Sequence, residues 1–215
     1  MTLDDLHNVH AGADVYVIGS GKTLEHYSPA FFNNRITIGV NQGWSHRLDT
    51  VNYMVTKYHK VAVEWRDSPR VGQLVVTRGE RGHLKRFIKD DRNLVVVNHN
   101  ENTVKGWKAD QWPSNTDALV ASHSTITTAM HLAAHLGAGN IFVVAADCGA
   151  LDGAWNIGGH PTGGTPQTAV SFEAQNRIVK QVLEERYDVR VVSLLPFTTP
   201  NMDGHKFESH AGRLN

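Results

Sequence analysis

The sequence has little cysteine, no long apolar run and no excess of one charge. Its single cysteine, Cys148, excludes an intrachain disulfide and a thiolate zinc site, and it is typical of a reducing compartment. No apolar run approaches the roughly 18 residues of a membrane span. The first residues carry neither a basic segment nor an apolar one, which argues against a signal peptide. We therefore expect a cytoplasmic protein.

Positive and negative side chains balance at 21 each, so no overall basic field would recruit nucleic acid or an anionic membrane. A local concentration of Lys and Arg remains between residues 78 and 92. The 13 histidines form no metalloprotease pattern. His131 and His135 are four apart on an expected helix but have no visible third ligand, so we predict no metal site.

Short apolar runs that end in polar turn residues predict buried strands. The expected strands lie at 14–18, 35–40, 50–56, 73–77, 93–98, 141–146 and 188–195, and the expected helices at 23–27, 124–136 and 172–187. Strands that are apolar throughout and alternate with helices favour an α/β fold, here a Rossmann-like, mostly parallel sheet with helices on both faces. We expect one domain over 1–215, with loop or lid insertions at about 99–121 and 149–168.

Ligands of such sheets bind beyond the carboxyl ends of the strands, and a glycine-rich turn, residues 19–23, follows the first strand. Gly19 and Gly21 allow close approach of a ligand, and the next helix offers free N–H groups to an anion; a tight structural turn is the alternative. The turn differs from a P-loop, which needs glycine where Tyr16 stands. It also lacks the dinucleotide fingerprint, which needs glycine at Leu24.

Polar residues follow the other strands. The amides of Asn41 and Gln42 either bind a base or sugar or close a turn. The run 122–125, Ser-His-Ser-Thr, precedes a helix, and capping explains one of its hydroxyls but not four polar residues. Asp147 is placed to hold a metal or a sugar hydroxyl, and the adjacent cysteine is a nucleophile or buried packing. His160, in a glycine-rich loop, is a general base or a surface histidine.

The order of these motifs resembles a superfamily that includes bacterial sialyltransferases using CMP-sialic acid and motility accessory factors that glycosylate flagellin. Residues 17–24 are similar to its Gly-x-Gly-Pro-Ser-Leu opening, 38–42 to its Asn turn, and 122–147 to its Ser/Thr block with a strand ending in Asp. Lys22 replaces the usual proline and Ala146 the usual glycine, and the tyrosines that bind the donor phosphate are absent.

This resemblance implies a sialyltransferase-like glycosyltransferase that moves a sugar from a nucleotide-sugar donor to an acceptor hydroxyl, with no required metal or cofactor. His160 would be the general base, and Asp147 would join it in the catalytic site. Together with the strand ends, the resemblance gives a set of residues expected to bind the nucleotide or the donor: Gly19, Ser20, Gly21, Lys22, Thr23, Asn41, Gln42, Thr56, Lys57, Ser122 and Ser124.

Two other functions stay open. One is a pyrophosphokinase or nucleotidyl transferase that binds Mg²⁺ through carboxylates such as Asp147 and Asp152. The other is a non-catalytic nucleotide-binding module. For the transferase, the acceptor is a glycan, a small molecule or a modified DNA base, and the sequence is compatible with a homo-oligomer.

Overall fold

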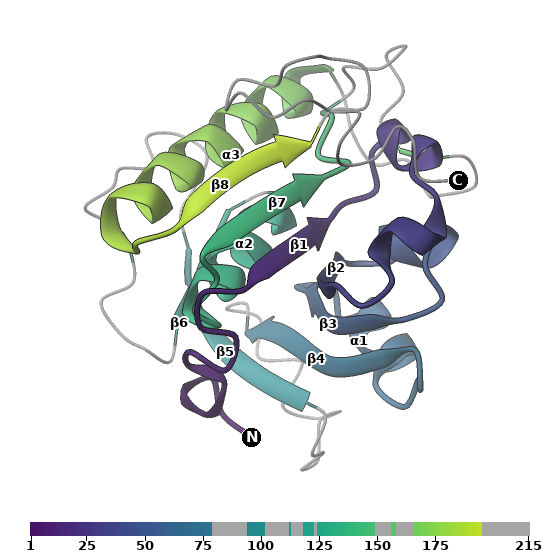
Figure 1. Ribbon diagram of the computed structural model, residues 1–215, viewed down its shortest axis with the longest axis horizontal. Coiled ribbons are helices and arrows are strands. Elements are labelled where there is room, and N and C mark those ends of the chain that lie inside the picture. The colour runs from purple at the N-terminus through teal and green to yellow at the C-terminus, as the bar shows by residue number, and fades with distance from the viewer. Residues whose placement is uncertain are drawn as a thin grey trace.

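A parallel sheet of eight strands forms the centre of the computed structural model (Figure 1). The structure describes residues 1–78, 94–101, 112, 118–122, 124–148, 156–157 and 166–194. The strands are β1 (Asp14–Ile18), β2 (Ile36–Val40), β3 (Val51–Thr56), β4 (Val71–Arg78), β5 (Leu94–Glu101), β6 (Ala118–Ala121), β7 (Asn140–Val144) and β8 (Arg190–Leu194). Every neighbouring pair is parallel, which confirms the predicted fold class.

The strand order, β6-β5-β4-β3-β2-β1-β7-β8, reverses direction beside the first strand. From β1 the chain moves outward to β6, and β7 then returns to pair with the other edge of β1, with Val17 beside Val143. The carboxyl ends of β1 and β7 therefore flank the topological switch point. This is the place where open α/β sheets bind their ligands.

Three α-helices and four 3₁₀ helices accompany the sheet in the described part of the chain. They are α1 (His59–Trp65), α2 (Thr125–His135), α3 (Pro166–Arg186), η1 (Asp4–Leu6), η2 (Lys22–His26), η3 (Pro29–Phe32) and η4 (Gly43–His46). One face of the sheet shares a hydrophobic core with α2, α3 and η1. The other face packs against α1 and the remaining 3₁₀ helices, where Trp44, Tyr27 and Phe31 are among the largest fully buried side chains. The two longer α-helices thus cover one face, and the short helices α1, η2, η3 and η4 cover the other.

Helix α2 is buried along its whole length, because it lies between the sheet and α3. It ends where Gly137 adopts a φ of +88°, a conformation that favours glycine. The N–H of Gly12 donates to the Gly137 carbonyl oxygen at 2.7 Å. The N-terminal segment therefore seals the end of α2 that lies away from the switch point.

Some expected boundaries were wrong. The insertion expected at 99–121 contains the end of β5 and all of β6, because the short apolar run Ala118–Ala121 adds an edge strand. Trp112 from the same stretch is buried, with its ring centroid 4.4 Å from that of His131. The loop expected at 149–168 gives way to α3 at Pro166, and α1 was not predicted. Within the described ranges, no helix combines the length and apolarity needed to cross a bilayer.

The two histidines on α2 are buried and hydrogen-bonded to other parts of the fold. The Nδ1 atom of His131 accepts from the N–H of Val120 at 2.9 Å, and its Nε2 lies 2.8 Å from the Tyr187 hydroxyl. Burial, and to a lesser extent the nearby His135, lowers the pKa of His131 to about 3. The Nε2 atom of His135 lies 2.8 Å from the carbonyl oxygen of Leu3. Each ring therefore has its own structural partners.

Candidate functional site

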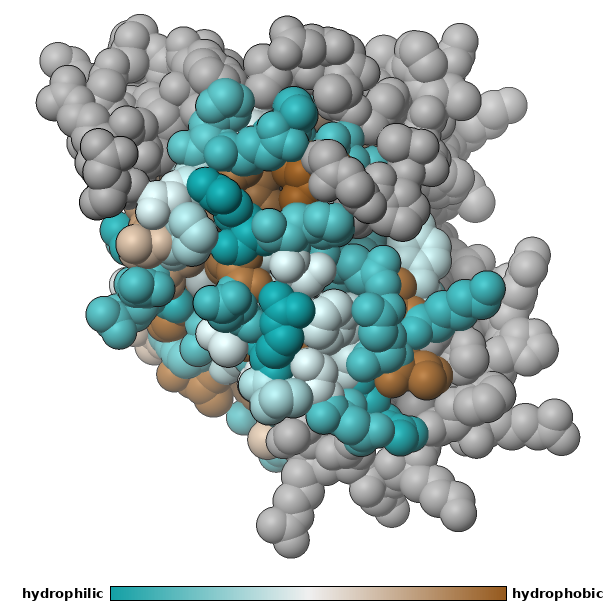
Figure 2. Space-filling view, turned by 90° about the vertical axis from the view of Figure 1, so that its right-hand side faces the viewer, coloured by the Kyte–Doolittle hydropathy of each residue, from teal (hydrophilic) through white to brown (hydrophobic). Residues whose placement is uncertain are grey.

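A cavity of about 140 Å³ opens at the switch point, beyond the carboxyl ends of β1, β2 and β7. Its walls come from the glycine turn, the end of β2, the start of α2, the segment after β7 and the start of α3. The lining residues are Gly19, Ser20, Gly21, Val40, Asn41, Tyr58, Ser124, Thr125, Ile126, Ala145, Ala146, Asp147, Cys148, Asn156, Phe172 and Asn176. Figure 2 looks toward the ends at which the β1, β7 and β8 arrows point and shows mainly hydrophilic residues, with apolar ones between them.

The glycine turn packs tightly against the segment that follows β7. A Cβ atom on Gly19 would lie 2.4 Å from the carbonyl oxygen of Ala145, and one on Gly21 would lie 2.5 Å from the Asp147 carboxyl. The N–H of Gly19 donates to Val144 at 2.9 Å, and that of Gly21 to Ala145 at 2.8 Å. These glycines are thus required by close approach of the chain to itself.

Asp147 closes the same turn from the other side. Its Oδ2 accepts from the backbone N–H of Thr23 at 2.7 Å, and its Oδ1 accepts from the Thr23 hydroxyl. Burial raises the pKa of Asp147, and the two bonds from Thr23 oppose that rise. The N–H groups of Gly19, Gly21 and Thr23 are therefore used within the protein. The next helix, which was expected to offer free N–H groups to an anion, uses that of Leu24 on the Gly21 carbonyl oxygen at 3.0 Å. In the described chain the N–H groups of Ser20 and Lys22 have no acceptor, and anion binding at this turn stays a prediction.

The opposite wall, the first residues of α2, has hydroxyls without partners. Ser124 is the N-cap residue, but its side chain makes no capping hydrogen bond. Ser124 is 4% exposed and Thr125 6% exposed, and within the described ranges neither hydroxyl has a hydrogen-bond partner. The first N–H groups of a helix also lack partners inside the helix and carry its positive dipole end. This wall therefore presents donors to the cavity.

Asn41 adds another donor from the end of β2. Its φ of +54° is one that asparagine tolerates better than most residues. Its side-chain Oδ1 accepts from the Thr56 hydroxyl at 2.9 Å. The side-chain Nδ2 has no acceptor among the residues described, and Asn41 lines the cavity. The predicted contact of Asn41 with a ligand thus has an available donor.

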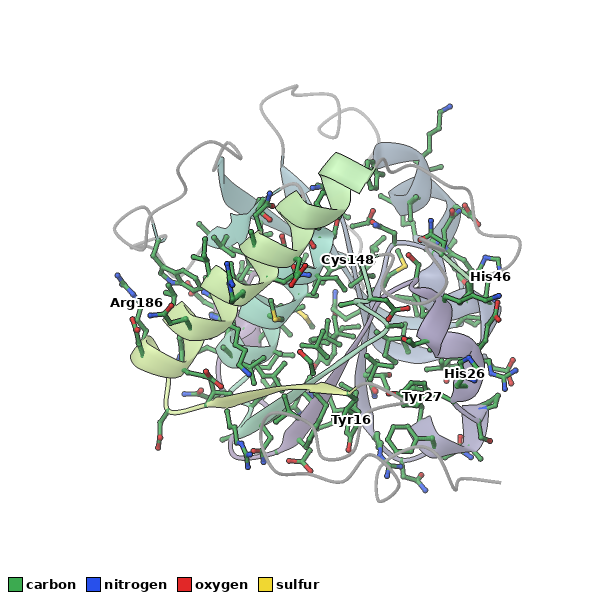
Figure 3. The ribbon with its side chains drawn as sticks, turned by 90° about the horizontal axis from the view of Figure 1, so that it is seen from above. Tyr16, His26, Tyr27, His46, Cys148 and Arg186 are labelled. Carbon is green, nitrogen blue, oxygen red and sulfur yellow. The ribbon has the colours of Figure 1, made fainter. Side chains whose placement is uncertain are left out.

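The cavity wall also contains strained backbone at Ala145 and Cys148, with φ of +54° and +50°. Such conformations in non-glycine residues gather at functional sites. Burial raises the pKa of the Cys148 thiol to about 11, with smaller effects from Glu173 and Asp147. In the view of Figure 3, Cys148 lies near the centre, whereas His26 and His46 lie on the side of the 3₁₀ helices. A thiol that stays protonated favours packing over nucleophilic attack.

The other predicted residues that the structure describes do not line the cavity. Lys22 forms an ion pair with Glu25 at 2.7 Å, and the Gln42 amide donates to Glu64. Thr56 lies behind Asn41, and Ser122 lies behind the start of α2, where its hydroxyl meets that of Thr127 at 2.8 Å. The Lys57 amine donates to the Ser122 carbonyl oxygen at 2.6 Å. Thr56, Lys57 and Ser122 therefore form a support behind the lining residues.

Tyr58, Phe172 and Asn176 are among the lining residues that were not predicted. Tyr58 is 52% exposed, and its position directly after the strand end Thr56-Lys57 was the available signal. Phe172 and Asn176 lie one turn apart on α3. They are far in sequence from any strand end, so no local sequence pattern indicated that they line the cavity. The Oδ1 atom of Asn176 is buried without a hydrogen-bond donor in the described parts of the chain. An acceptor left in this state carries a desolvation cost that a ligand donor would relieve.

Several predictions fall on residues outside those described. They concern the general base His160, the alternative magnesium ligand Asp152 and the basic segment after residue 78. Among the described residues, no group of three His, Cys, Asp or Glu side chains is placed to hold a metal ion.

The arrangement of strands and helices is an α/β fold of the sialyltransferase type. The chain is similar to the sialyltransferase CstII from Campylobacter jejuni, solved with a substrate analogue, cytidine-5'-monophosphate, at a TM-score of 0.54 and 11% identity over 88% of this chain and 82% of that one. A structure of the sialyltransferase CST-II with a trisaccharide acceptor and CMP gives 0.50 and 8% over 86% and 82%. These likenesses confirm the predicted sialyltransferase-like fold. No protein-family model matches the sequence, and no curated protein sequence matches it.

Proposed function

We propose that this protein is a glycosyltransferase that binds a nucleotide-sugar in the switch-point cavity and moves the sugar to an acceptor hydroxyl. The observation that carries the proposal is a set of donors around the cavity that have no acceptor among the described residues: the hydroxyls of Ser124 and Thr125 and the Nδ2 group of Asn41. Donors that converge at a helix N-terminus suit the oxygens of a phosphate. The fold likeness to sialyltransferases solved with CMP supports the choice of a nucleotide.

The reaction breaks the bond between the anomeric carbon of the sugar and the phosphate oxygen. The nucleotide leaves with the bonding electron pair, and the acceptor oxygen forms the new bond and loses its proton. The donors at the start of α2 would stabilise the negative charge that develops on the leaving phosphate. We propose His160 as the base that takes the acceptor proton, because a histidine is half ionised near neutral pH.

We place Asp147 in a supporting role. Both of its oxygens accept hydrogen bonds from Thr23, so it fixes the glycine turn as one wall of the cavity. The turn then contributes shape and the N–H of Ser20, while most of the hydrogen-bond donors come from the opposite wall.

The test is a two-part screen of the full chain. Calorimetric binding of CMP, UMP, GMP and AMP identifies the base, and turnover of the corresponding nucleotide-sugars is then measured with a panel of glycan and small-molecule acceptors. We expect one base to bind and its nucleotide-sugar to be consumed, with His160→Ala abolishing turnover but not nucleotide binding. Binding without any turnover would indicate a non-catalytic module, and no binding of any nucleotide would refute the proposal. Full activity of His160→Ala would refute the role of that histidine.

A further inference from the structure

Within the described residues, every polar atom of Asn41 except one is hydrogen-bonded. Its backbone N–H donates to the Val55 carbonyl oxygen at 3.0 Å, and its own carbonyl oxygen accepts from the Trp44 indole at 3.2 Å. Its side-chain Oδ1 accepts from the Thr56 hydroxyl at 2.9 Å. The Nδ2 group is what remains for the cavity. The residue therefore has a fixed position, and the orientation of its amide decides which chemistry it offers to a ligand.

The Thr56 hydroxyl decides that orientation. Thr56 is fully buried, and its Oγ1 already accepts the N–H of Tyr58 at 3.1 Å. The single hydroxyl hydrogen then needs an acceptor, and the Oδ1 of Asn41 is the one within reach. If the amide were reversed, its NH₂ would donate to Thr56 and the buried hydroxyl hydrogen would lose its partner, which is costly. The two hydrogen bonds, from the Tyr58 N–H to Thr56 and from the Thr56 hydroxyl to Asn41, therefore have fixed donors and acceptors.

This arrangement follows from the pairing of β2 with β3. Val40 stands beside Val55 in the parallel register, so the next residues of the two strands, Asn41 and Thr56, are neighbours at the carboxyl edge. The backbone of Asn41 leaves the strand with a φ of +54°. Its side chain then reaches both Thr56 and the cavity.

We infer that Thr56 is a positioning residue that holds the Asn41 amide with its NH₂ toward the cavity, so that Asn41 donates to a negatively charged oxygen of the ligand. This inference rests on the proposed nucleotide site, in which the charged oxygen belongs to a phosphate. Asn41 then faces the same group as the hydroxyls of Ser124 and Thr125. A group that is itself a hydrogen-bond donor, such as a base amino group, is disfavoured at this position.

The experiment compares each nucleoside monophosphate with its nucleoside, using the base that binds the wild-type protein best among CMP, UMP, GMP and AMP. The variants are Thr56→Val, which keeps the shape but loses the hydroxyl, and Thr56→Ser, which keeps the hydroxyl. We expect Thr56→Val to lower the affinity for the monophosphate about three- to tenfold, as for loss of one oriented hydrogen bond, and to leave the affinity for the nucleoside unchanged. Thr56→Ser should bind both as the wild type does.

Asn41→Asp tests the same donor without altering Thr56, because a carboxylate still accepts from the hydroxyl. It replaces the NH₂ by a charged oxygen, so we expect monophosphate affinity to fall at least tenfold while nucleoside affinity holds. This variant tests the donor at Asn41, and Thr56→Ala, which removes the same hydroxyl, tests the positioning role if Thr56→Val fails to fold. Equal binding by Thr56→Val and Thr56→Ser, or parallel losses for nucleoside and monophosphate, would overturn the positioning role alone. Failure of every nucleotide to bind the wild-type protein would overturn the proposed function as well.

Discussion

The two walls of the cavity use their polar groups in opposite ways. In the glycine turn, the N–H groups of Gly19, Gly21 and Thr23 donate to the last residue of β7 and to the segment after it. At the start of α2, the hydroxyls of Ser124 and Thr125 remain without partners in the described chain. The wall with the more recognisable sequence motif is therefore the more completely satisfied one, and the less distinctive wall holds the unpaired donors.

This difference separates two reasons for a polar or glycine-rich motif at a strand end. Such a motif is required either because a ligand approaches or because another part of the chain does. In the glycine turn, the Ala145 carbonyl oxygen and the Asp147 carboxyl occupy the space that a side chain would need. Substitutions in the two walls should accordingly affect different properties, stability in the first and binding in the second.

The largest effect is expected for Gly19→Ala. The new Cβ would meet the backbone oxygen of Ala145 at 2.4 Å, and backbone cannot move aside as a flexible side chain does. We expect the free energy of unfolding to fall by about 1–3 kcal/mol, or more, as for other overpacked sites. Chemical denaturation measures it. Ser124→Ala is the matched control from the other wall, and equal stabilities of the two variants would remove the distinction between the walls.

Asp147→Asn should follow, because an amide offers one acceptor oxygen where the carboxylate offers two to Thr23. We expect a loss of about 1–3 kcal/mol in unfolding free energy, with the cavity wall loosened. Thr23→Val, which removes one of the two bonds, should lose less. An Asp147→Asn protein of wild-type stability but without turnover would restore the catalytic role that the sequence suggested.

Ser124→Ala and Thr125→Val should have the opposite effect, lowering nucleotide affinity while leaving stability nearly unchanged. The Ser124 side chain makes no capping bond, so removing its hydroxyl costs little stability. Each substitution removes one donor from the cavity, and we expect nucleotide affinity to fall about three- to tenfold for each. Isothermal titration with the nucleotide that binds the wild type provides the measurement. Unchanged affinity in the double variant would mean that the ligand does not contact this wall.

The last effect is on the pH dependence of stability and concerns Lys57, which joins the end of β3 to the Ser122 carbonyl oxygen behind the α2 wall. Burial lowers the pKa of its amine from 10.5 to about 8. Between these values the unfolded chain binds more protons than the folded one, so stability should rise with pH from about 8 to 10.5. Lys57→Met should show a flatter dependence when both proteins are denatured across this range. Identical slopes would show that the amine is solvated.

Periodicity and strand-end residues predicted much of this fold. Apolar runs such as Asp14–Ile18 and Asn140–Val144 are near-continuous because both of their faces are covered, and their ends brought Gly19 and Asp147 to one edge. The four-residue strand β6 was missed because its apolar run is too short to stand out from polar neighbours. Asn176 was beyond prediction, since it reaches the cavity through the packing of α3 on α2.

The complete burial of α2 has a mechanical consequence for the ligand. The helix is fixed between the sheet and α3, and its far end is sealed by the bond from Gly12 to Gly137. Its first turn therefore cannot tilt or slide to follow a poorly fitting group. A ligand that meets these donors finds them already in place, which lowers the entropy lost on binding and penalises molecules whose oxygens are spaced differently. Selectivity at this wall then comes from the fixed positions of its donors.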